Sequence, residues 1–174
     1  MKKLAIFDLD GTLYLKNSHI EILSKYYNTG YYNSLIFKMF SKFFPKITLK
    51  YLNYKYDKIS LQIKKSFLLP FRESALKLLE EKRKAGYKIK IISNAPYLLI
   101  ENAGKALNVE VAKAEISKKG KILSSEDYDF LFVCTDNITD RDLLEMADEQ
   151  YIYVNKKTKK YFEKYFKKAI LLEE

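Results

Sequence analysis

Short apolar runs alternate with helix-like stretches along much of the chain. Residues 4–7, 88–92 and 130–134 each have the length and apolar character of a buried strand. A helical stretch from about residue 71 to 85 precedes the second run and is stopped by Gly86. Another follows Pro96 and extends to about residue 107. This alternation of strand and helix favours an α/β fold.

Two carboxylates stand at the end of the first apolar run. Asp8 and Asp10 are two positions apart, and Gly11 supplies the turn by which the chain leaves the strand. Alternate residues of a strand face the same way, so both carboxylates are aimed at one point beyond its carboxyl end. Open α/β sheets bind ligands there. The plain alternative is a surface turn, since Asp and Gly are common turn residues.

Polar residues also follow the other two predicted strands. Ser93 and Asn94 come after the second strand and before a helix, whose N-terminal N–H groups suit an anion. The alternative for this pair is a helix cap. After the third strand come Thr135, Asp136 and Asp140. Asp142, at a predicted helix start, is better explained by a favourable interaction with the helix dipole than by metal binding.

Together these segments resemble one family. The string from Phe7 to Leu13 is similar to the opening motif of the haloacid dehalogenase-like (HAD) superfamily of phosphohydrolases, and Ser93-Asn94 is similar to its second motif. Residues 135–144 resemble its last motif, with Thr135 where Gly is usual. The run Asp-Asn-x-x-Asp-x-x-Leu-Leu, followed by residues 151–155, resembles the phosphoserine-phosphatase-like branch. The resemblance implies a three-layer, Rossmann-like α/β core with a parallel sheet.

The resemblance also implies roles for individual residues. Asp8 would be the nucleophile and Asp10 the general acid/base, and members that displace halide lack the second Asp, so Asp10 favours a phosphatase. A carboxylate nucleophile forms an aspartyl-phosphate and divides hydrolysis into two easier steps. The implied phosphate-binding residues are Gly11, Thr12, Ser93 and Asn94. The implied metal residues are Asp8, Asp10, Asp136 and Asp140, the last either as a ligand or as a residue that orients the water.

Charge alone calls for a cation at such a site. Two acidic groups and a trianionic transition state cannot share a pocket without one, which predicts Mg²⁺ as the cofactor. The backbone carbonyl of Asp10, the carboxylates of Asp8 and Asp136 and several waters are the expected ligands.

The family's remaining motif is a lysine near the start of a helix. In this chain, residues 109–136 look too short for that helix and predict a strand, a hairpin turn at residues 118–121 and a second arm. Lys113, Lys119 and Lys121 are the candidates, and we favour Lys121 because a hairpin tip can reach over the strand ends. This departure leaves open a second class of function, a binding or regulatory protein on a decayed phosphatase scaffold.

The predicted domains are a core of residues 1–15 and 70–174 and a helical cap of residues 16–69. One Rossmann-like crossover needs a single helix, so the extra residues are expected to cover the strand ends. Two apolar stripes at helical spacing are predicted to form the cap's own core. The first consists of Ile36, Met39, Phe40, Phe43 and Ile47, with a break at Pro45, and the second of Leu49, Leu52, Tyr56, Ile59 and Ile63.

The cap carries most of the chain's charge of +10. Residues 14–69 contain ten Lys against Glu21 and Asp57, interleaved with aromatic residues. This pattern is compatible with attraction of a phosphorylated substrate, with an anionic membrane surface or with nucleic acid, and equally with the coding bias of an A/T-rich genome. A Lys-rich helix within residues 156–168 repeats it, and its aromatic residues are expected to pack on the sheet.

The function predicted from the sequence is therefore a Mg²⁺-dependent phosphatase acting on a small phosphorylated substrate, a sugar, amino-acid or lipid phosphate. Nucleic acid is a less favoured partner, and peripheral membrane contact is retained as an alternative. Cys134 is the only cysteine, which makes a reducing cytoplasm the simplest location. No run reaches about 18 apolar residues, which predicts a soluble protein. The sequence leaves the oligomeric state open.

Overall fold

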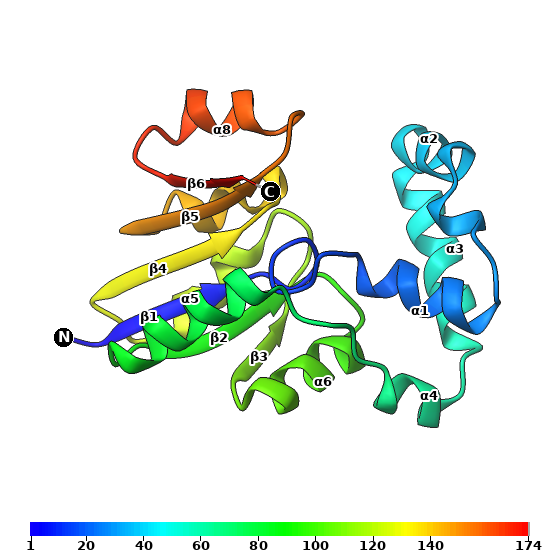
Figure 1. The fold of residues 1–174 in the computed structure, drawn as a ribbon, viewed down its shortest axis with the longest axis horizontal. Helices are drawn as coiled ribbons and strands as arrows, with labels where there is room; N and C mark the ends of the chain where they lie inside the picture. Colours follow the sequence, from blue (N-terminus) through cyan, green and yellow to red (C-terminus); the bar gives the residue numbers. More distant parts are fainter. Residues whose placement is uncertain (174) are drawn as a thin grey trace.

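A single parallel sheet forms the centre of the computed structural model, which describes residues 1–173 (Figure 1). Within these residues the sheet has six strands in the order β3-β2-β1-β4-β5-β6. The strands are β1 (Lys3–Phe7), β2 (Lys88–Ser93), β3 (Glu110–Lys113), β4 (Phe130–Thr135), β5 (Glu149–Val154) and β6 (Ile170–Glu173). The predicted core segment ends at residue 174, which lies outside the described part.

The central strand β1 is buried on both faces because its side chains from Leu4 to Phe7 are all apolar. Ala5 and Phe7 enter one hydrophobic cluster, and Leu4 and Ile6 enter the cluster on the opposite face. Phe7 is paired with Ile91 of β2 and with Cys134 of β4. This register brings the carboxyl ends of the three strands to one edge, so that the residues following each strand meet there.

Helices cover both faces of the sheet, which confirms the predicted three-layer α/β fold. On one face α5 (Glu73–Lys84) and α6 (Tyr97–Leu107) pack their apolar side chains on the strands. On the other face lie α7 (Arg141–Leu144), α8 (Lys159–Tyr165) and the 3₁₀ helices η2 (Lys119–Ser125) and η3 (Ile138–Asp140). The helix predicted before residue 86 and the helix predicted to end near 107 correspond to α5 and α6.

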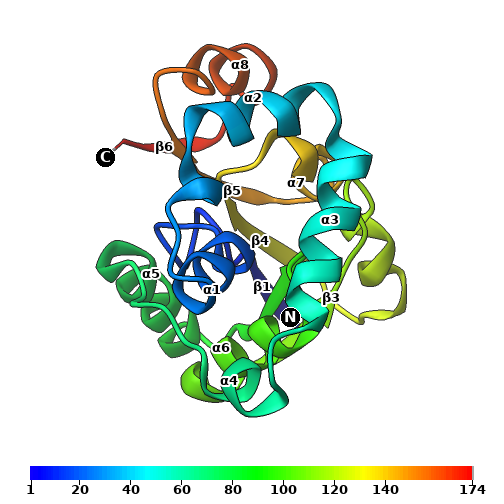
Figure 2. The ribbon, with the colours of Figure 1, turned by 90° about the vertical axis from the view of Figure 1, so that its right-hand side faces the viewer.

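The segment between β1 and α5 forms a separate group of helices beside the core. Its elements are α1 (Ser18–Tyr26), η1 (Tyr31–Asn33), α2 (Leu35–Phe43), α3 (Pro45–Asp57) and α4 (Leu61–Ser66). In Figure 1 these helices stand on the side toward which the arrowheads of β1 and β4 point, and Figure 2 views the core from that side. They share a hydrophobic cluster of their own, which includes Ile22, Leu23, Phe37, Leu52 and Tyr56.

The prediction for the first apolar stripe was wrong. Ile36, Met39, Phe40, Phe43 and Ile47 are all exposed, between 44% and 76%. The helices are where the spacing predicts them, and Pro45 is the first residue of α3 as expected. However, α2 meets the rest of the cap through Phe37, on its other side, so the stripe faces outward.

The second stripe does contribute to the cap's core, with exceptions. Leu52, Tyr56 and Ile59 are buried, whereas Leu49 and Ile63 are exposed. Leu52 and Tyr56 lie on α3 one turn apart, and both pack against α1 in the same cluster. Helical periodicity thus located the elements correctly but did not say which stripe would find a partner.

The C-terminal helix α8 packs on the sheet as predicted. Phe162 and Phe166 are buried in the cluster that covers β4 and β5, and Tyr161 packs at its edge. Tyr165 is an exception and is half exposed. Within residues 1–173, no helix combines the length and the apolar character that crossing a membrane would require.

The packing of α6 on β3 leads to a first prediction. A Cβ at Gly104 would lie 2.2 Å from Val111 Cγ1 and 3.0 Å from the backbone oxygen of Val109. We expect Gly104→Ala to lower the free energy of unfolding by about 2 kcal/mol, because the helix must move away from the strand. Urea unfolding monitored by circular dichroism measures this change.

Gly30→Ala is the matched control. A Cβ at Gly30 meets nothing within 4 Å, and its φ of −83° suits any residue. Both substitutions restrict the unfolded chain equally, so the difference between them isolates the contact at Val111. Equal stability of the two variants would contradict the close approach of α6 and β3.

Candidate active site

Asp8 lies directly beyond β1, at the edge where the strands end. Its N–H donates to the backbone oxygen of Cys134 at 2.9 Å, which continues the β1–β4 ladder by one residue. Its side chain is buried, and Oδ1 accepts a hydrogen bond from Lys119 Nζ at 2.7 Å. The carboxylate is therefore held by rigid backbone on one side and by a buried ammonium on the other.

The turn after Asp8 requires glycine. Gly11 has φ of +82°, and a Cβ there would lie 2.1 Å from Asp136 Oδ2. The close approach brings Asp136, which follows β4, against the turn that follows β1. Thr12 is fully buried, and its hydroxyl donates to Asp136 Oδ1 at 3.3 Å. In this structure Thr12 thus orients a carboxylate, and its predicted contact with phosphate stays a prediction.

Asp10 lies beside Asp8 and lines the same cavity. Its Oδ1 accepts a hydrogen bond from the backbone N–H of Ser18, the first residue of α1, at 2.8 Å. Burial raises the pKa of the Asp10 carboxyl to about 7, although the hydrogen bonds from Ser18 act in the opposite direction. The contact with Ser18 also ties the start of the cap to the catalytic turn.

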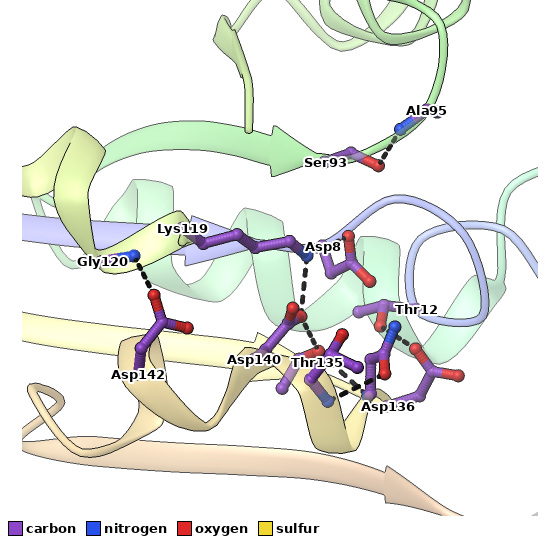
Figure 3. A network of polar contacts seen from close by, with 12 residues as sticks. Asp8, Thr12, Ser93, Ala95, Lys119, Gly120, Thr135, Asp136, Asp140 and Asp142 are labelled. Carbon is purple, nitrogen blue, oxygen red and sulfur yellow. Dashed lines mark hydrogen bonds and ion pairs between the residues drawn. The ribbon is translucent and has the colours of Figure 1, made fainter. Parts of the chain in front are cut away.

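Lys119 is the lysine that reaches Asp8. Its side chain is 1% exposed, and Nζ lies 2.7 Å from Asp8 Oδ1 and 2.7 Å from Asp140 Oδ2 (Figure 3). Burial alone would lower the pKa of the Lys119 ammonium, but the charges of Asp8 and Asp140 outweigh it and the pKa is raised. Lys119 is therefore charged when both carboxylates are.

Two expectations about this segment were wrong. We favoured Lys121, but Lys121 is exposed on the surface while Lys119 occupies the site. We also expected a hairpin turn at residues 118–121, whereas a 3₁₀ helix begins at Lys119. The tighter 3₁₀ winding fits a helical turn into an interval that looked too short for an α-helix, with the lysine at its first position.

Asp140 holds the lysine in place. Its Oδ2 accepts hydrogen bonds from Lys119 Nζ and, at 2.6 Å, from the hydroxyl of Thr135. Burial and the charge of Asp8 raise the pKa of the Asp140 carboxyl to about 6, against the opposing effect of Lys119. We predicted Asp140 either as a metal ligand or as a residue that orients the water, and both roles stay predictions. In the structure Asp140 instead binds Lys119 and Thr135.

Thr135 and Asp142 are functional candidates to which the sequence analysis gave no role in the site. Thr135 fixes Asp140, as described, and its Oγ accepts from the backbone N–H of Asn137 at 3.1 Å. Asp142 Oδ2 accepts from the N–H of Gly120 at 2.8 Å and so fixes the start of η2, next to Lys119. An acidic residue two positions after Asp140 was the available signal, but we attributed it to the helix dipole.

Ser93 and Asn94 lie on the other side of Asp8, at the end of β2. Ser93 is buried, and its Oγ accepts from the backbone N–H of Ala95 at 3.3 Å. With its amide oriented to satisfy hydrogen bonding, Asn94 donates to the backbone oxygens of Ala114 and Glu115 at 3.1 and 3.2 Å. The Asn94 side chain therefore braces the loop after β3, and only its backbone N–H is left as the predicted phosphate ligand.

The carboxylates outnumber the buried cations at this edge. Burial raises the pKa of the Asp136 carboxyl to about 7, and the negative charges of Asp8 and Asp140 add to the effect. Asp140 Oδ1 is buried without a hydrogen-bond partner among residues 1–173. Crowded carboxylate oxygens of this kind suit a hard divalent cation such as Mg²⁺.

The predicted set of four metal carboxylates is not gathered into one cluster. In the described part of the chain, no three Asp, Glu, His or Cys side chains are placed to hold a metal ion together. Asp140 is bound by Lys119 and Thr135, and the Asp10 carboxylate by Ser18. A site of two carboxylates, Asp8 and Asp136, with backbone and water oxygens remains compatible with the structure, because Mg²⁺ usually keeps several waters.

A cavity of about 1230 Å³ opens between the core and the cap at this point. The core contributes Asp8, Asp10, Ser93 and Asp136 to its wall. The cap contributes a mixed polar and apolar wall that consists of Lys16, Asn17, His19, Ile20, Leu49, Leu52, Asn53, Tyr56 and Asp57. The carboxylates therefore face a space that would hold a small organic phosphate.

His19, the only histidine, lies in this wall and not beside Lys119. It packs edge-on against Tyr56, with ring centroids 5.3 Å apart. Burial lowers the pKa of the imidazole to about 4, so His19 is neutral at physiological pH. Nε2 has no hydrogen-bond partner within residues 1–173, which leaves it free to contact a ligand in the cavity.

Known structures share this fold. A substrate-bound phosphoserine phosphatase superposes with a TM-score of 0.68 at 14% identity, over 100% of this chain and 94% of that one. A HAD-family hydrolase from Salmonella enterica serovar Typhi gives a TM-score of 0.63 at 14% identity, over 91% of this chain and 65% of that one. The chain has the HAD-family fold. More specifically, it is the fold of the phosphoserine phosphatases.

A third structure, a phospho-aspartyl intermediate analogue of phosphoserine phosphatase, gives a TM-score of 0.63 at 16% identity, over 99% of this chain and 94% of that one. The sequence itself matches no family model and no curated protein. At such identities the likeness is one of fold. The roles of Asp8, Lys119 and Asp136 therefore rest on the geometry of this chain alone.

The buried ion pair of Lys119 leads to a second prediction. We expect Lys119→Ala to lower the free energy of unfolding by about 3 kcal/mol at neutral pH, because it leaves Asp8 and Asp140 buried without their cation. Lys121→Ala, the matched control two residues away, should change it by less than about 0.5 kcal/mol. Chemical unfolding measures both changes, and similar losses in both variants would contradict the assignment of Lys119.

Proposed function

We propose that the protein is a Mg²⁺-dependent phosphomonoesterase that works through an aspartyl-phosphate on Asp8. One observation carries this proposal: Asp8 is buried at the wall of the cavity, with its Oδ1 bound to Lys119. A carboxylate held in place by a cation, with one oxygen still available, is arranged to attack an electrophile that is itself anionic. The likeness to phosphoserine phosphatases, one of them an analogue of a phospho-aspartyl intermediate, supports the same chemistry.

In the first step the free carboxylate oxygen of Asp8 attacks the phosphorus of the substrate. The bond between phosphorus and the ester oxygen breaks, and Asp10 gives its proton to the departing oxygen. Burial raises the pKa of Asp10 to about 7, which favours a carboxyl that can hold a proton before attack. Lys119 and the hydroxyl of Ser93 are placed on either side of Asp8 to stabilise charge on the phosphoryl oxygens.

In the second step a water molecule attacks the phosphorus of the aspartyl-phosphate. Asp10, now ionised, takes the proton from that water, and the bond between Asp8 and phosphorus breaks to release inorganic phosphate. The same carboxyl thus acts first as an acid and then as a base. Its hydrogen bond from Ser18 keeps it in position for both steps.

Mg²⁺, when bound, supplies the positive charge that a single buried lysine cannot. The residues that would hold it are Asp8 and Asp136, together with the backbone carbonyl of Asp10. Thr12 and Gly11 support Asp136 from the β1 turn.

The cavity favours a small organic phosphate as the substrate. Its volume of about 1230 Å³ exceeds what a phosphoryl group alone would fill, so part of the leaving group would rest against the cap. A sugar, an amino-acid or a lipid phosphate would fit this description. A cytoplasmic location remains a prediction, with the free, buried Cys134 as its support.

The alternative function, a binding or regulatory protein on a decayed phosphatase scaffold, is no longer supported by the observation that suggested it. It was based on the apparent lack of a lysine in the shortened segment, and Lys119 now occupies that place. A catalytically weak binding protein would not need a buried lysine shared between two carboxylates, an arrangement that is costly to bury.

A third prediction tests the nucleophile. We expect Asp8→Asn to lower turnover of p-nitrophenyl phosphate by at least about a thousandfold, because an amide is nearly the same shape but a far weaker nucleophile. Turnover with and without Mg²⁺ and a thermal melt of each variant are the measurements. Asp127→Asn, at an exposed ion pair with Lys2, is the control and should keep full turnover. Near wild-type turnover in Asp8→Asn would rule out the proposed mechanism.

A fourth prediction tests the metal without relying on activity. Mg²⁺ at about a hundred times its dissociation constant should raise the free energy of unfolding by about 2.7 kcal/mol, because it binds the folded chain and relieves carboxylate repulsion. Thermal melts across a Mg²⁺ series measure the rise. Asp136→Asn should abolish most of it, while Asp127→Asn should not. A Mg²⁺ response that is unchanged in Asp136→Asn would place the ion elsewhere.

A further inference from the structure

The outward face of α2 and the start of α3 is unusually apolar. Seven side chains, each at least 44% exposed, lie within thirteen consecutive residues. We call this surface the apolar tip, and it consists of Leu35, Ile36, Met39, Phe40, Phe43, Phe44 and Ile47. Within residues 1–173 no other element covers it.

The exposure of the tip follows from how α2 is held. Successive residues of a helix are turned by about 100°, so positions 35, 36, 39, 40 and 43 share one side, while Phe37 points away from them. Phe37 is buried, with its ring 5.2 Å from Tyr31 and 5.5 Å from Tyr32, measured between centroids. The helix is therefore held against the cap by its other side, and the apolar stripe is not needed to form the cap's core.

Lysines border the tip, and acidic residues are absent from it. Residues 31–51 contain Lys38, Lys42, Lys46 and Lys50 and no Asp or Glu. All four are exposed, and none forms an ion pair with another residue in the described part of the chain. A surface that is both apolar and positively charged needs a partner that can accept hydrophobic side chains and supply negative charge.

We propose that the apolar tip docks on an anionic phospholipid bilayer. Amphipathic helices with Phe and Leu on one face and Lys beside it lie in the bilayer interface, with the apolar face among the acyl chains. Each Lys close to an anionic surface strengthens that attraction. A second copy of the chain is a poor partner, since it would oppose four lysines to four lysines. Nucleic acid would pair the lysines but has no apolar phase for Leu35, Ile36 and Met39.

The apolar tip and the cavity described above share helix α3 but lie on different sides of it. Ile47 belongs to the tip, while Leu49 and Leu52, on the same helix α3, line the cavity. The inference stands on exposure and charge and does not depend on the proposed phosphatase activity.

The test uses the full chain and lipid vesicles. Sedimentation with vesicles of phosphatidylcholine, with and without about 30% phosphatidylglycerol, should show binding to the anionic vesicles and little to the neutral ones. Replacement of three tip residues, as Ile36→Gln/Phe40→Gln/Phe43→Gln, should weaken binding at least about tenfold. The matched control, Leu61→Gln/Leu68→Gln/Ile170→Gln, removes three apolar residues of similar exposure outside the tip and should bind normally.

A second pair of variants separates local charge from total charge. Lys42→Glu/Lys46→Glu should weaken binding to anionic vesicles at least about tenfold. Lys167→Glu/Lys168→Glu changes the net charge equally at exposed residues outside the cap, between α8 and β6, and it should retain binding. Equal losses in the two charge variants would overturn the proposal, because attraction would then depend on net charge alone.

Three further results would also overturn it. One is wild-type chain that does not sediment with anionic vesicles. Another is self-association that the tip substitutions abolish while vesicle binding is unaffected, which would assign the tip to a second copy. The third is equally tip-dependent binding to single-stranded nucleic acid with none to vesicles. Asp8→Asn should bind vesicles as the wild type does, so that failure of the phosphatase proposal and failure of this one are distinguished.

Discussion

The pairing of Lys119 with Asp8 and Asp140 is the interaction on which the site depends. Three charged groups are buried at the carboxyl edge of a parallel sheet, and removal of the cation would leave two anions without compensation. The pairing also joins distant parts of the chain, since Asp8 follows β1, Lys119 begins η2 and Asp140 follows β4. Two further hydrogen bonds stabilise this pairing. Thr135 donates to Asp140, and Asp142 accepts from the N–H of Gly120, the residue after Lys119. The positions of Asp8 and Lys119 are thus fixed by a local network of ion pairs and hydrogen bonds.

The sheet explains why so many carboxylates gather in one place. Parallel strands in register end together, so residues that follow β1 and β4 by similar intervals are brought to the same edge. There Gly11 permits Asp136 to approach the β1 turn more closely than any side chain would allow. The raised pKa of Asp136 is a consequence of that crowding and of burial. An enzyme that binds a divalent cation would gain from the same crowding, because the cation removes the repulsion.

Much of the core could be predicted from local sequence. The strands β1, β2 and β4 are short apolar runs, so the polar residues that follow them could be predicted to meet at one edge of the sheet. Asp8, Asp10, Ser93 and Asp136 do line one cavity there. Lys119 could not be distinguished from Lys121 in this way, because the choice depends on whether residues 119–125 turn as a hairpin or as a 3₁₀ helix. That difference rests on contacts with residues far along the chain, such as the hydrogen bond from Gly120 to Asp142. The role of Asp140 was left between two alternatives for the same reason.

The cap shows a different limit of prediction from the sequence. A stripe at helical spacing establishes that a helix has an apolar side, but its burial depends on whether another element is available to cover that side. In α2 the single buried contact of Phe37 is sufficient to hold the helix, and the broader stripe is left outside. In α3, Leu52 and Tyr56 are buried in the cap's hydrophobic cluster, and together with the exposed Leu49 they also line the cavity. The same segment therefore has an inner side that limits what the cavity can hold and an outer side with a composition suited to a lipid surface. Because both sides belong to one short helical unit tied to the catalytic turn through Ser18 and Asp10, any partner that fixes the outer side would also restrict how the cap sits over the site.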